Sequence, residues 1–323
     1  MKYGTIASVD RPVSRLFFGA ARPEMIRGEN ANELLDSMFA LGVNAFDCAR
    51  NYGLAEKSLG MWLEHRGRRD DVVLLSKCGH HDTETMEKRV NAKCMYEDLS
   101  VSLSLLGVDK IDIYLLHRDD ESRPVAEMVE TFNQMHAEGK IGAFGASNWT
   151  HERIEQANEY AYAHNLLPFS VSSPNYGLAR QVCDPWGGNC VSISGPENAA
   201  ARAWYQKNAM PVIAYSSIGR GFFSGRVKSD DPESATRVLD PFAQKGYCCA
   251  DNFERLRRAE ILAGRHNASV SQIALAFLFS GGLDAYAVVS AGSAARMKEN
   301  ADALRIELSD RERAYLDLAA ESI

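Results

Sequence analysis

The sequence lacks any apolar run close to the length that a membrane-spanning helix requires. Its longest uninterrupted run, at residues 273–279, falls far short of the roughly 18 residues needed. The N-terminal stretch MKYGTIASVDRP also has no apolar segment of the kind found in secretory signals. We therefore expect neither a membrane anchor nor export.

Cysteine pairs and clusters of positive charge are absent as well. The seven cysteines include no C-x-x-C spacing, which argues against a zinc site and against a disulfide framework. A reducing compartment suits such thiols, so we expect a cytoplasmic protein. The formal net charge is −7 and no Lys/Arg cluster stands out, so no nucleic-acid partner is expected.

What the sequence does contain is a regular alternation of apolar runs and amphipathic segments. The runs lie at residues 15–19, 44–47, 72–77, 111–117, 141–147, 169–173, 211–217 and 285–290. Several are apolar at consecutive positions, which is typical of parallel strands buried on both faces. Eight strand-like runs, each followed by a helical pattern, predict an α/β fold of the (β/α)₈ barrel type. An open doubly wound sheet, which usually has fewer strands, is the alternative.

No linker rich in Gly, Ser or Pro divides the chain, so we expect a single domain over residues 1–323 that ends in a helix at 309–321. Two long segments, 178–195 and 222–251, follow predicted strands. Loops in that position of a barrel lie over the active face and determine specificity. Their aromatic residues are candidate substrate contacts, unless they pack within their own loops. These residues are Trp186, Phe242 and Tyr247.

Polar side chains stand at the ends of several predicted strands. Asp47 follows the run NAF, Lys77 closes VVLLSK and His117 closes IDIYLLH, while Tyr52 lies in the loop DCARNYG. A phenol with a pKa near 10 becomes a better acid beside an ammonium group, and a carboxylate can hold that ammonium in place. Tyr52 is therefore a candidate general acid tuned by Lys77 and Asp47, with His117 orienting a substrate oxygen. Taken singly, each residue could equally belong to an ordinary ion pair or backbone contact.

These motifs together resemble the aldo-keto reductase family. The stretches NAFDCARNYGLAEKSLGMWL, SKCG, SVSLSLLGVDKIDIYLLHRDD and IGAFGASNW carry the resemblance, which extends from about residue 15 to residue 300. The residues that match the family signature are Asp47, Tyr52, Gly53, Glu56, Lys77 and His117. The resemblance implies an NAD(P)H-dependent reductase of aldehydes, ketones or sugar carbonyls on a (β/α)₈ barrel, with Tyr52 as the proton donor.

The resemblance also implies a set of cofactor-binding residues. Ser147 and Asn148 match the pair that bonds the nicotinamide amide, and Tyr215 matches the aromatic ring that stacks on it. The loop SSIGRGFFSG resembles the pyrophosphate loop, and GSAARMKENADAL resembles the adenosine-phosphate motif. The residues implied there are Ser216, Gly219, Arg220, Gly221, Gly292, Ser293, Arg296, Glu299 and Asn300. Arg296 is placed for a 2′-phosphate, which favours NADP(H), because a guanidinium can donate two parallel hydrogen bonds to phosphate.

Two positions depart from the family pattern. Ser173 stands where most members have a Gln that supports the nicotinamide, so this cofactor contact is a weaker match. Ser290 and Ala291 stand where many members have a Lys for the 2′-phosphate. NAD(H) therefore stays possible as the cofactor.

Two other functions compete with reduction. One is a nucleotide-binding regulatory subunit that resembles channel β subunits and serves a partner protein. The other is a metal-dependent barrel isomerase or hydrolase, which needs His and carboxylate groups at several strand ends. Of the eight histidines only His117 ends a predicted strand, so we predict no metal. A small carbonyl compound is the expected ligand, and the sequence leaves the oligomeric state open.

Overall fold

The computed structural model describes residues 1–323, and its strands form a closed barrel. The eight parallel strands are β3 (Leu16–Gly19), β4 (Ala45–Asp47), β5 (Val73–Cys78), β6 (Ile111–Leu116), β7 (Ile141–Ser147), β8 (Val171–Ser173), β9 (Val212–Ala214) and β10 (Ala285–Val289). Each overlaps one of the eight apolar runs. The prediction of a (β/α)₈ barrel is confirmed.

The chain divides into two compact units. The first consists of residues 1–173 and 290–294, and the second of residues 174–289 and 295–323. The expectation of a single domain over residues 1–323 stays a prediction.

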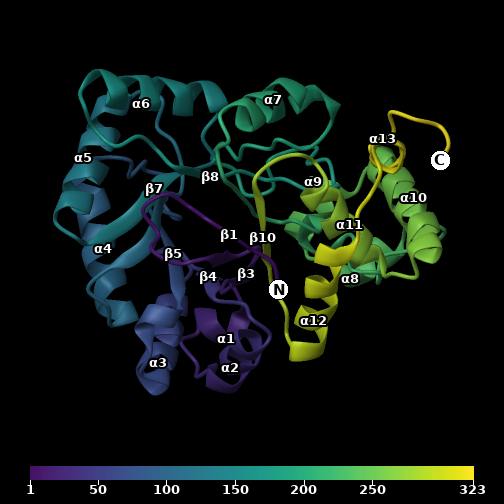
Figure 1. Ribbon diagram of the computed structural model, residues 1–323, viewed down its shortest axis with the longest axis horizontal. Helices are drawn as coiled ribbons and strands as arrows, with labels where there is room; N and C mark the ends of the chain where they lie inside the picture. The colour runs from purple at the N-terminus through teal and green to yellow at the C-terminus, as the bar shows by residue number, and fades with distance from the viewer. The chain divides into compact units, whose positions relative to one another are not determined.

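The first unit contains strands β3 to β8 and a short antiparallel pair, β1 (Tyr3–Gly4) and β2 (Val13–Ser14). Its helices are α1 (Pro23–Ile26), α2 (Asn32–Ala40), α3 (Ala55–Arg66), η1 (Arg69–Asp71), α4 (Ala92–Leu106), α5 (Val125–Ala137) and α6 (His151–Ala163). Helices α3 to α6 lie outside the strands in Figure 1. Every residue of β5, β6 and β7 is buried, as expected for parallel strands covered on both faces.

Two glycines of the first unit permit close approaches between its elements. A Cβ atom at Gly145 in β7 would lie 1.8 Å from the carbonyl oxygen of Val171 in β8. A Cβ atom at Gly60 in α3 would lie 2.3 Å from the carbonyl oxygen of Leu105 in α4. Any side chain at either position would force these backbones apart.

The second unit is mainly helical apart from β9 and β10. Its helices are η2 (Pro196–Asn198), α7 (Ala199–Lys207), η3 (Gly219–Gly221), α8 (Ser234–Val238), α9 (Pro241–Tyr247), α10 (Ala250–His266), α11 (Val270–Phe279), α12 (Ala294–Asp302), η4 (Ala303–Arg305) and α13 (Asp310–Leu316). Helices α10, α11 and α13 pack together (Figure 1). The predicted C-terminal helix at 309–321 is shorter than expected, because α13 ends at Leu316.

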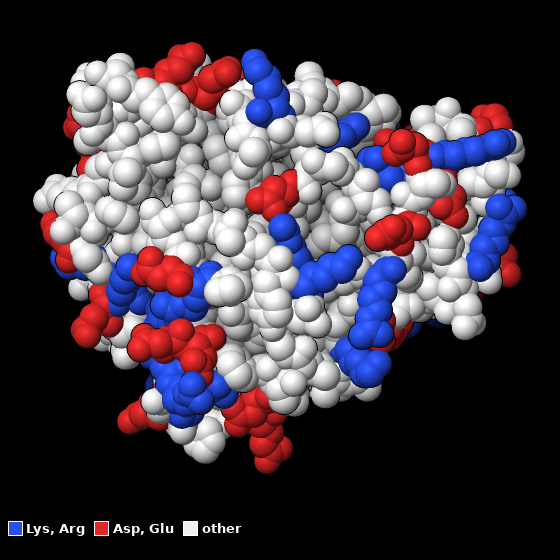
Figure 2. Space-filling model, in the orientation of Figure 1, with Lys and Arg blue, Asp and Glu red and all other residues white.

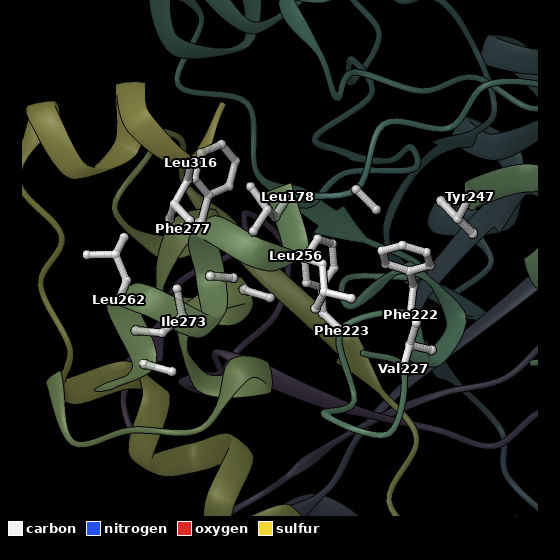
Figure 3. Close-up of a cluster of buried hydrophobic side chains, with 14 of the residues drawn as sticks. Leu178, Phe222, Phe223, Val227, Tyr247, Leu256, Leu262, Ile273, Phe277 and Leu316 are labelled. Atoms are coloured by element: carbon white, nitrogen blue, oxygen red, sulfur yellow. The ribbon is translucent and has the colours of Figure 1, made fainter. Parts of the chain in front are cut away.

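Residues from both predicted long loops contribute to the hydrophobic core of the second unit. Leu178, Phe222, Phe223 and Tyr247 pack with side chains of α10 and α11 (Figure 3). The segment 222–251 also contains helices α8 and α9. Much of this segment is therefore part of the folded core, where the sequence predicted long loops over the active face.

Charged side chains of both signs are interspersed on the face shown in Figure 2. Among the helices, none combines the length and the apolar character needed to cross a membrane.

Candidate active site

The C-terminal ends of three neighbouring strands of the first unit carry the predicted catalytic residues. Asp47 is the last residue of β4, Lys77 is the penultimate residue of β5, and His117 directly follows β6. The strand pairing continues past β6, because the His117 N–H donates to the carbonyl oxygen of Cys78 at 2.7 Å. Parallel pairing thus holds these side chains at one edge of the unit, where the active face of a barrel lies.

Asp47 and Lys77 form a buried ion pair. The Lys77 ammonium donates to Asp47 Oδ1 at 2.5 Å and to the carbonyl oxygen of Cys48 at 2.8 Å, and the two residues are only 3% and 5% exposed. Burial lowers the pKa of Lys77, but the charge and hydrogen bond of Asp47, together with the nearby Tyr52 and Cys48 side chains, outweigh this effect, so the pKa is raised and Lys77 keeps its proton. Burial raises the pKa of the Asp47 carboxyl against the opposing Lys77 charge.

Tyr52 lies in the loop between β4 and α3, next to this ion pair. The Lys77 Nζ atom is 5.2 Å from the centre of the Tyr52 ring. The rings of Tyr52 and His117 are 5.6 Å apart in an edge-to-face arrangement. The structure therefore brings together all four residues that the sequence assigned to the reaction.

The acidity of Tyr52 differs from the simple expectation. Burial raises the pKa of its phenol above the usual value, and the Lys77 ammonium opposes that shift without cancelling it. Lys77 thus acts in the predicted direction, but the net change is upward. The sequence could indicate the nearby charge but not how completely the phenol is desolvated.

His117 has a neutral imidazole in this environment. Burial lowers its pKa well below the usual value, and the positive charges of Lys77 and Arg118 add to the effect. Its Nδ1 atom is buried and has no hydrogen-bond partner. The ring of His80 lies 4.9 Å from that of His117, and burial lowers the pKa of His80 to about 4.

The predicted nicotinamide residues of the first unit lie beside His117. Asn148 Nδ2 donates to the carbonyl oxygen of His117 at 3.1 Å, and Ser147 Oγ donates to the carbonyl oxygen of Ser173 at 2.6 Å. Asn148 has a left-handed backbone with φ 60°. The Oγ atom of Ser173 is buried without a partner, so it is available to hydrogen-bond a polar ligand.

Gly292 lies near an arginine that sequence reasoning missed. A Cβ atom at Gly292 would be 3.3 Å from Arg22 Nη2, and Arg22 Nη1 donates to Ser290 Oγ at 3.4 Å. Arg22 also forms an ion pair with Glu24 at 2.5 Å. A guanidinium therefore stands next to the position where the family resemblance led us to expect a lysine. Ser293 follows Gly292 directly and makes further interactions.

The second unit holds the predicted pyrophosphate loop. Its backbone is left-handed at four residues. The φ angles are 52° at Ser216, 61° at Gly219, 50° at Arg220 and 94° at Gly221. Three successive residues of this loop, from Gly219 to Gly221, are thus left-handed, a conformation that glycine adopts without steric cost at two of the three positions. The Arg220 side chain forms an ion pair with Asp240 at 2.9 Å.

The three candidate substrate contacts lie in different surroundings within the second unit. The Trp186 ring packs edge-on against Tyr215 at 6.1 Å, with the Arg220 guanidinium 5.1 Å from its centre. Phe242 is exposed. Tyr247 is buried, and its hydroxyl accepts a hydrogen bond from Asn175. The burial of Tyr247 therefore agrees with packing within its own segment rather than with a substrate contact.

Three of the predicted adenosine-phosphate residues, Arg296, Glu299 and Asn300, lie on helix α12. Arg296 Nη1 pairs with Glu299 Oε2 at 3.1 Å, while the other Glu299 carboxylate oxygen accepts from Ser271 at 3.2 Å. Asn300 is buried, and its Oδ1 atom has no partner. Donor and acceptor groups suited to a nucleotide are thus present on this helix.

Comparison with known proteins identifies the family. The family model described as Aldo/keto reductase family matches residues 15–321. The chain belongs to the aldo/keto reductase family. The family and the names of its relatives support an oxidoreductase that reduces carbonyl groups.

Individual relatives agree with this assignment. Aldo-keto reductase yakc of Schizosaccharomyces pombe, whose name includes NADP(+), is 29% identical over 290 residues, covering 87% of this chain and 80% of that protein. Aldo-keto reductase str7 of Strobilurus tenacellus is 27% identical over 297 residues, covering 90% of this chain and 80% of that protein. A crystal structure of a thermostable aldo-keto reductase with the inhibitor epalrestat superposes with a TM-score of 0.73 at 23% identity, over 99% of this chain and 100% of that one. This structural likeness supports the fold.

Proposed function

We propose that this protein reduces an aldehyde, ketone or sugar carbonyl with hydride from a nicotinamide cofactor, using Tyr52 as the general acid. The observation that carries the proposal is the buried Asp47–Lys77 ion pair beside Tyr52 and His117. Membership of the aldo/keto reductase family supports the reaction class.

The bound nicotinamide would supply the hydride, and the protein would handle the proton. A neutral His117 can donate a hydrogen bond to the carbonyl oxygen and hold it near the Tyr52 hydroxyl. A phenol with a raised pKa keeps its proton until that oxygen acquires the basicity of an alkoxide. Lys77 then stabilises the phenolate that remains, and Asp47 keeps Lys77 protonated and in place.

NADP(H) is the favoured cofactor in this proposal, and NAD(H) is the alternative. Ser147, Asn148, Ser173 and Tyr215 are assigned to the nicotinamide. The pyrophosphate and the adenosine phosphate are assigned to Ser216, Gly219, Arg220, Gly221, Gly292, Ser293, Arg296, Glu299 and Asn300. The two buried atoms without hydrogen-bond partners, Ser173 Oγ and Asn300 Oδ1, support a nicotinamide cofactor of either kind. The NADP(+) in the name of the Schizosaccharomyces pombe relative supports NADP(H).

The test of the mechanism is the Tyr52→Phe variant. We expect carbonyl-dependent oxidation of NADPH to fall by about 10²- to 10⁴-fold, the usual contribution of general acid catalysis. Binding of NADPH, measured by the quenching of tryptophan fluorescence, should persist because the phenol is assigned no contact with the cofactor. A variant that reduces carbonyls at the wild-type rate would disprove the role of Tyr52. Tight NADPH binding by a wild-type protein that reduces no carbonyl would favour a regulatory subunit.

A further inference from the structure

Arg118, the residue after His117, is a buried charge without a partner. It is only 7% exposed. Its backbone carbonyl accepts a hydrogen bond from Trp149 Nε1 at 3.2 Å, which fixes the main chain at this point. Its guanidinium forms no ion pair and no hydrogen bond within the chain, and the Nε atom is fully enclosed. Charged side chains are almost never buried in this way unless they are paired.

The acidic groups around Arg118 are already engaged by other cations. Asp119 Oδ2 pairs with Arg153 at 3.2 Å, and Asp120 pairs with Lys88 at 2.9 Å. The Asp119 Oδ1 atom has no partner, yet Arg118 does not reach it. The Asp47 carboxylate is taken by Lys77. A positive charge therefore remains uncompensated at this end of β6.

The charge of Arg118 acts on the reacting groups. It contributes to the lowered pKa of both His117 and His80, after the larger effect of burial. It also opposes the rise in the pKa of Tyr52 that burial causes. The guanidinium consequently lies close enough to interact with the residues proposed to hold the carbonyl. The imidazoles of His80 and His117 are uncharged at neutral pH, so they neither add to this positive charge nor offset it.

We propose that Arg118 binds an anionic group of the substrate, so that the preferred substrates are aldehydes or ketones carrying a carboxylate or phosphate. This inference rests on the proposed function. A planar guanidinium with all of its donors free can bind either anion through two parallel hydrogen bonds. A neutral substrate would leave the charge buried and unpaired, and sites of this type discriminate strongly against ligands that lack the matching group.

The experiment compares matched pairs of aldehydes. Butanal is paired with 4-oxobutanoate, and glyceraldehyde with glyceraldehyde 3-phosphate, so the two pairs distinguish a carboxylate site from a phosphate site. For wild-type protein we expect kcat/KM to be about 10- to 100-fold higher for the anionic member of at least one pair, the usual value of hydrogen bonds to a charged group. In Arg118→Leu this ratio should approach one, and Arg118→Lys should restore part of it.

Arg123→Leu is the matched control, because Arg123 is exposed on the same loop and pairs with Glu127. This variant should keep the wild-type ratio. The inference is overturned if wild-type protein shows no preference in either pair, or if Arg118→Leu lowers both members of a pair equally. Reduction of neutral aldehydes in those cases would leave the proposed function standing.

A binding measurement covers the case in which no aldehyde is reduced, which would refute the proposed function. Calorimetry with succinate and with inorganic phosphate then reports on the anion site directly. Binding by wild-type protein that is lost in Arg118→Leu but retained in Arg123→Leu supports the site. Equal binding by all three proteins, or binding by none, overturns it.

Discussion

Replacing Lys77 with Met tests whether the Asp47–Lys77 pair is the electrostatic centre of the site. The substitution keeps most of the apolar stem and removes the ammonium. Asp47 then stays 5% exposed and loses the partner that its Oδ1 atom contacts at 2.5 Å. No other cation is paired with this carboxylate, so its charge becomes buried and uncompensated.

The cost of breaking such a pair is about 3–5 kcal/mol in the free energy of unfolding. This cost should depend on pH. Burial already raises the pKa of Asp47, and without Lys77 the rise must be larger. A carboxyl that binds its proton more tightly in the folded state than in the unfolded state favours folding at low pH. That contribution is lost as the pH rises through the folded-state pKa. The destabilisation of Lys77→Met should therefore be small near about pH 4, close to the pKa of an Asp carboxyl in an unfolded chain, and reach its full size by about pH 8.

Urea unfolding, monitored by tryptophan fluorescence, measures the free energy of unfolding at the low and the high pH. Lys88→Met is the control, since it removes a half-exposed lysine from its ion pair with Asp120 and should cost only about 0–1 kcal/mol. Adding Asp47→Asn to Lys77→Met removes the orphaned charge, so the pH dependence should disappear. An equal loss of stability at both pH values, or a loss no larger than that of Lys88→Met, would refute the electrostatic argument.

Two further substitutions follow from the structure. Gly145→Ala should destabilise the protein by several kcal/mol in thermal unfolding, because its Cβ would lie 1.8 Å from a backbone oxygen of β8. Gly264→Ala, in α10 where nothing lies within 4 Å, should instead stabilise it by up to about 1 kcal/mol, and a loss there would contradict the reasoning. Arg22→Leu should raise the KM for NADPH about 10-fold and leave that for NADH nearly unchanged, as hydrogen bonds between charged groups predict. Equal effects on the two cofactors in steady-state kinetics would rule out a contact between Arg22 and the 2′-phosphate.

The part of the site that lies at strand ends could be predicted from the sequence. Asp47, Lys77 and His117 each close or follow an apolar run, and parallel pairing fixes where such positions lie. Tyr52 follows β4 so closely that its loop can reach only a small region. For these residues, local pattern and barrel topology together determine the neighbours.

Other features depend on packing that the sequence does not display. The segment 222–251 has no clear apolar period, yet Phe222, Phe223 and Tyr247 enter the core of the second unit. One signal was present, since Asp240 and Pro241 stand as an N-cap and first helical residue, and they begin α9. The depth at which a side chain is buried sets its desolvation, so the raised pKa of Tyr52 could not be predicted from the identity of its neighbours.

The same limit explains why the anion site was missed. Arg118 is adjacent to two aspartates in the sequence, and adjacency suggests that it pairs with one of them. In the structure those aspartates pair with Arg153 and Lys88 instead, so the buried Arg118 stays unpaired. Which cation stays without an ion pair depends on all the ion pairs that form around it. Predicting it requires the positions of side chains that are far apart in the sequence.

The charge balance around Tyr52 links the proposed chemistry to the proposed substrate. Asp47 neutralises Lys77, the nearby imidazoles are uncharged, and Arg118 adds one uncompensated positive charge. Hydride transfer places negative charge on the carbonyl oxygen, and proton transfer then places it on the phenolate of Tyr52. A fixed positive charge nearby stabilises both. An anionic substrate would neutralise Arg118, and the remaining stabilisation of the phenolate would then come from Lys77. Removal of Lys77 should therefore lower kcat for an anionic aldehyde more than for its neutral partner.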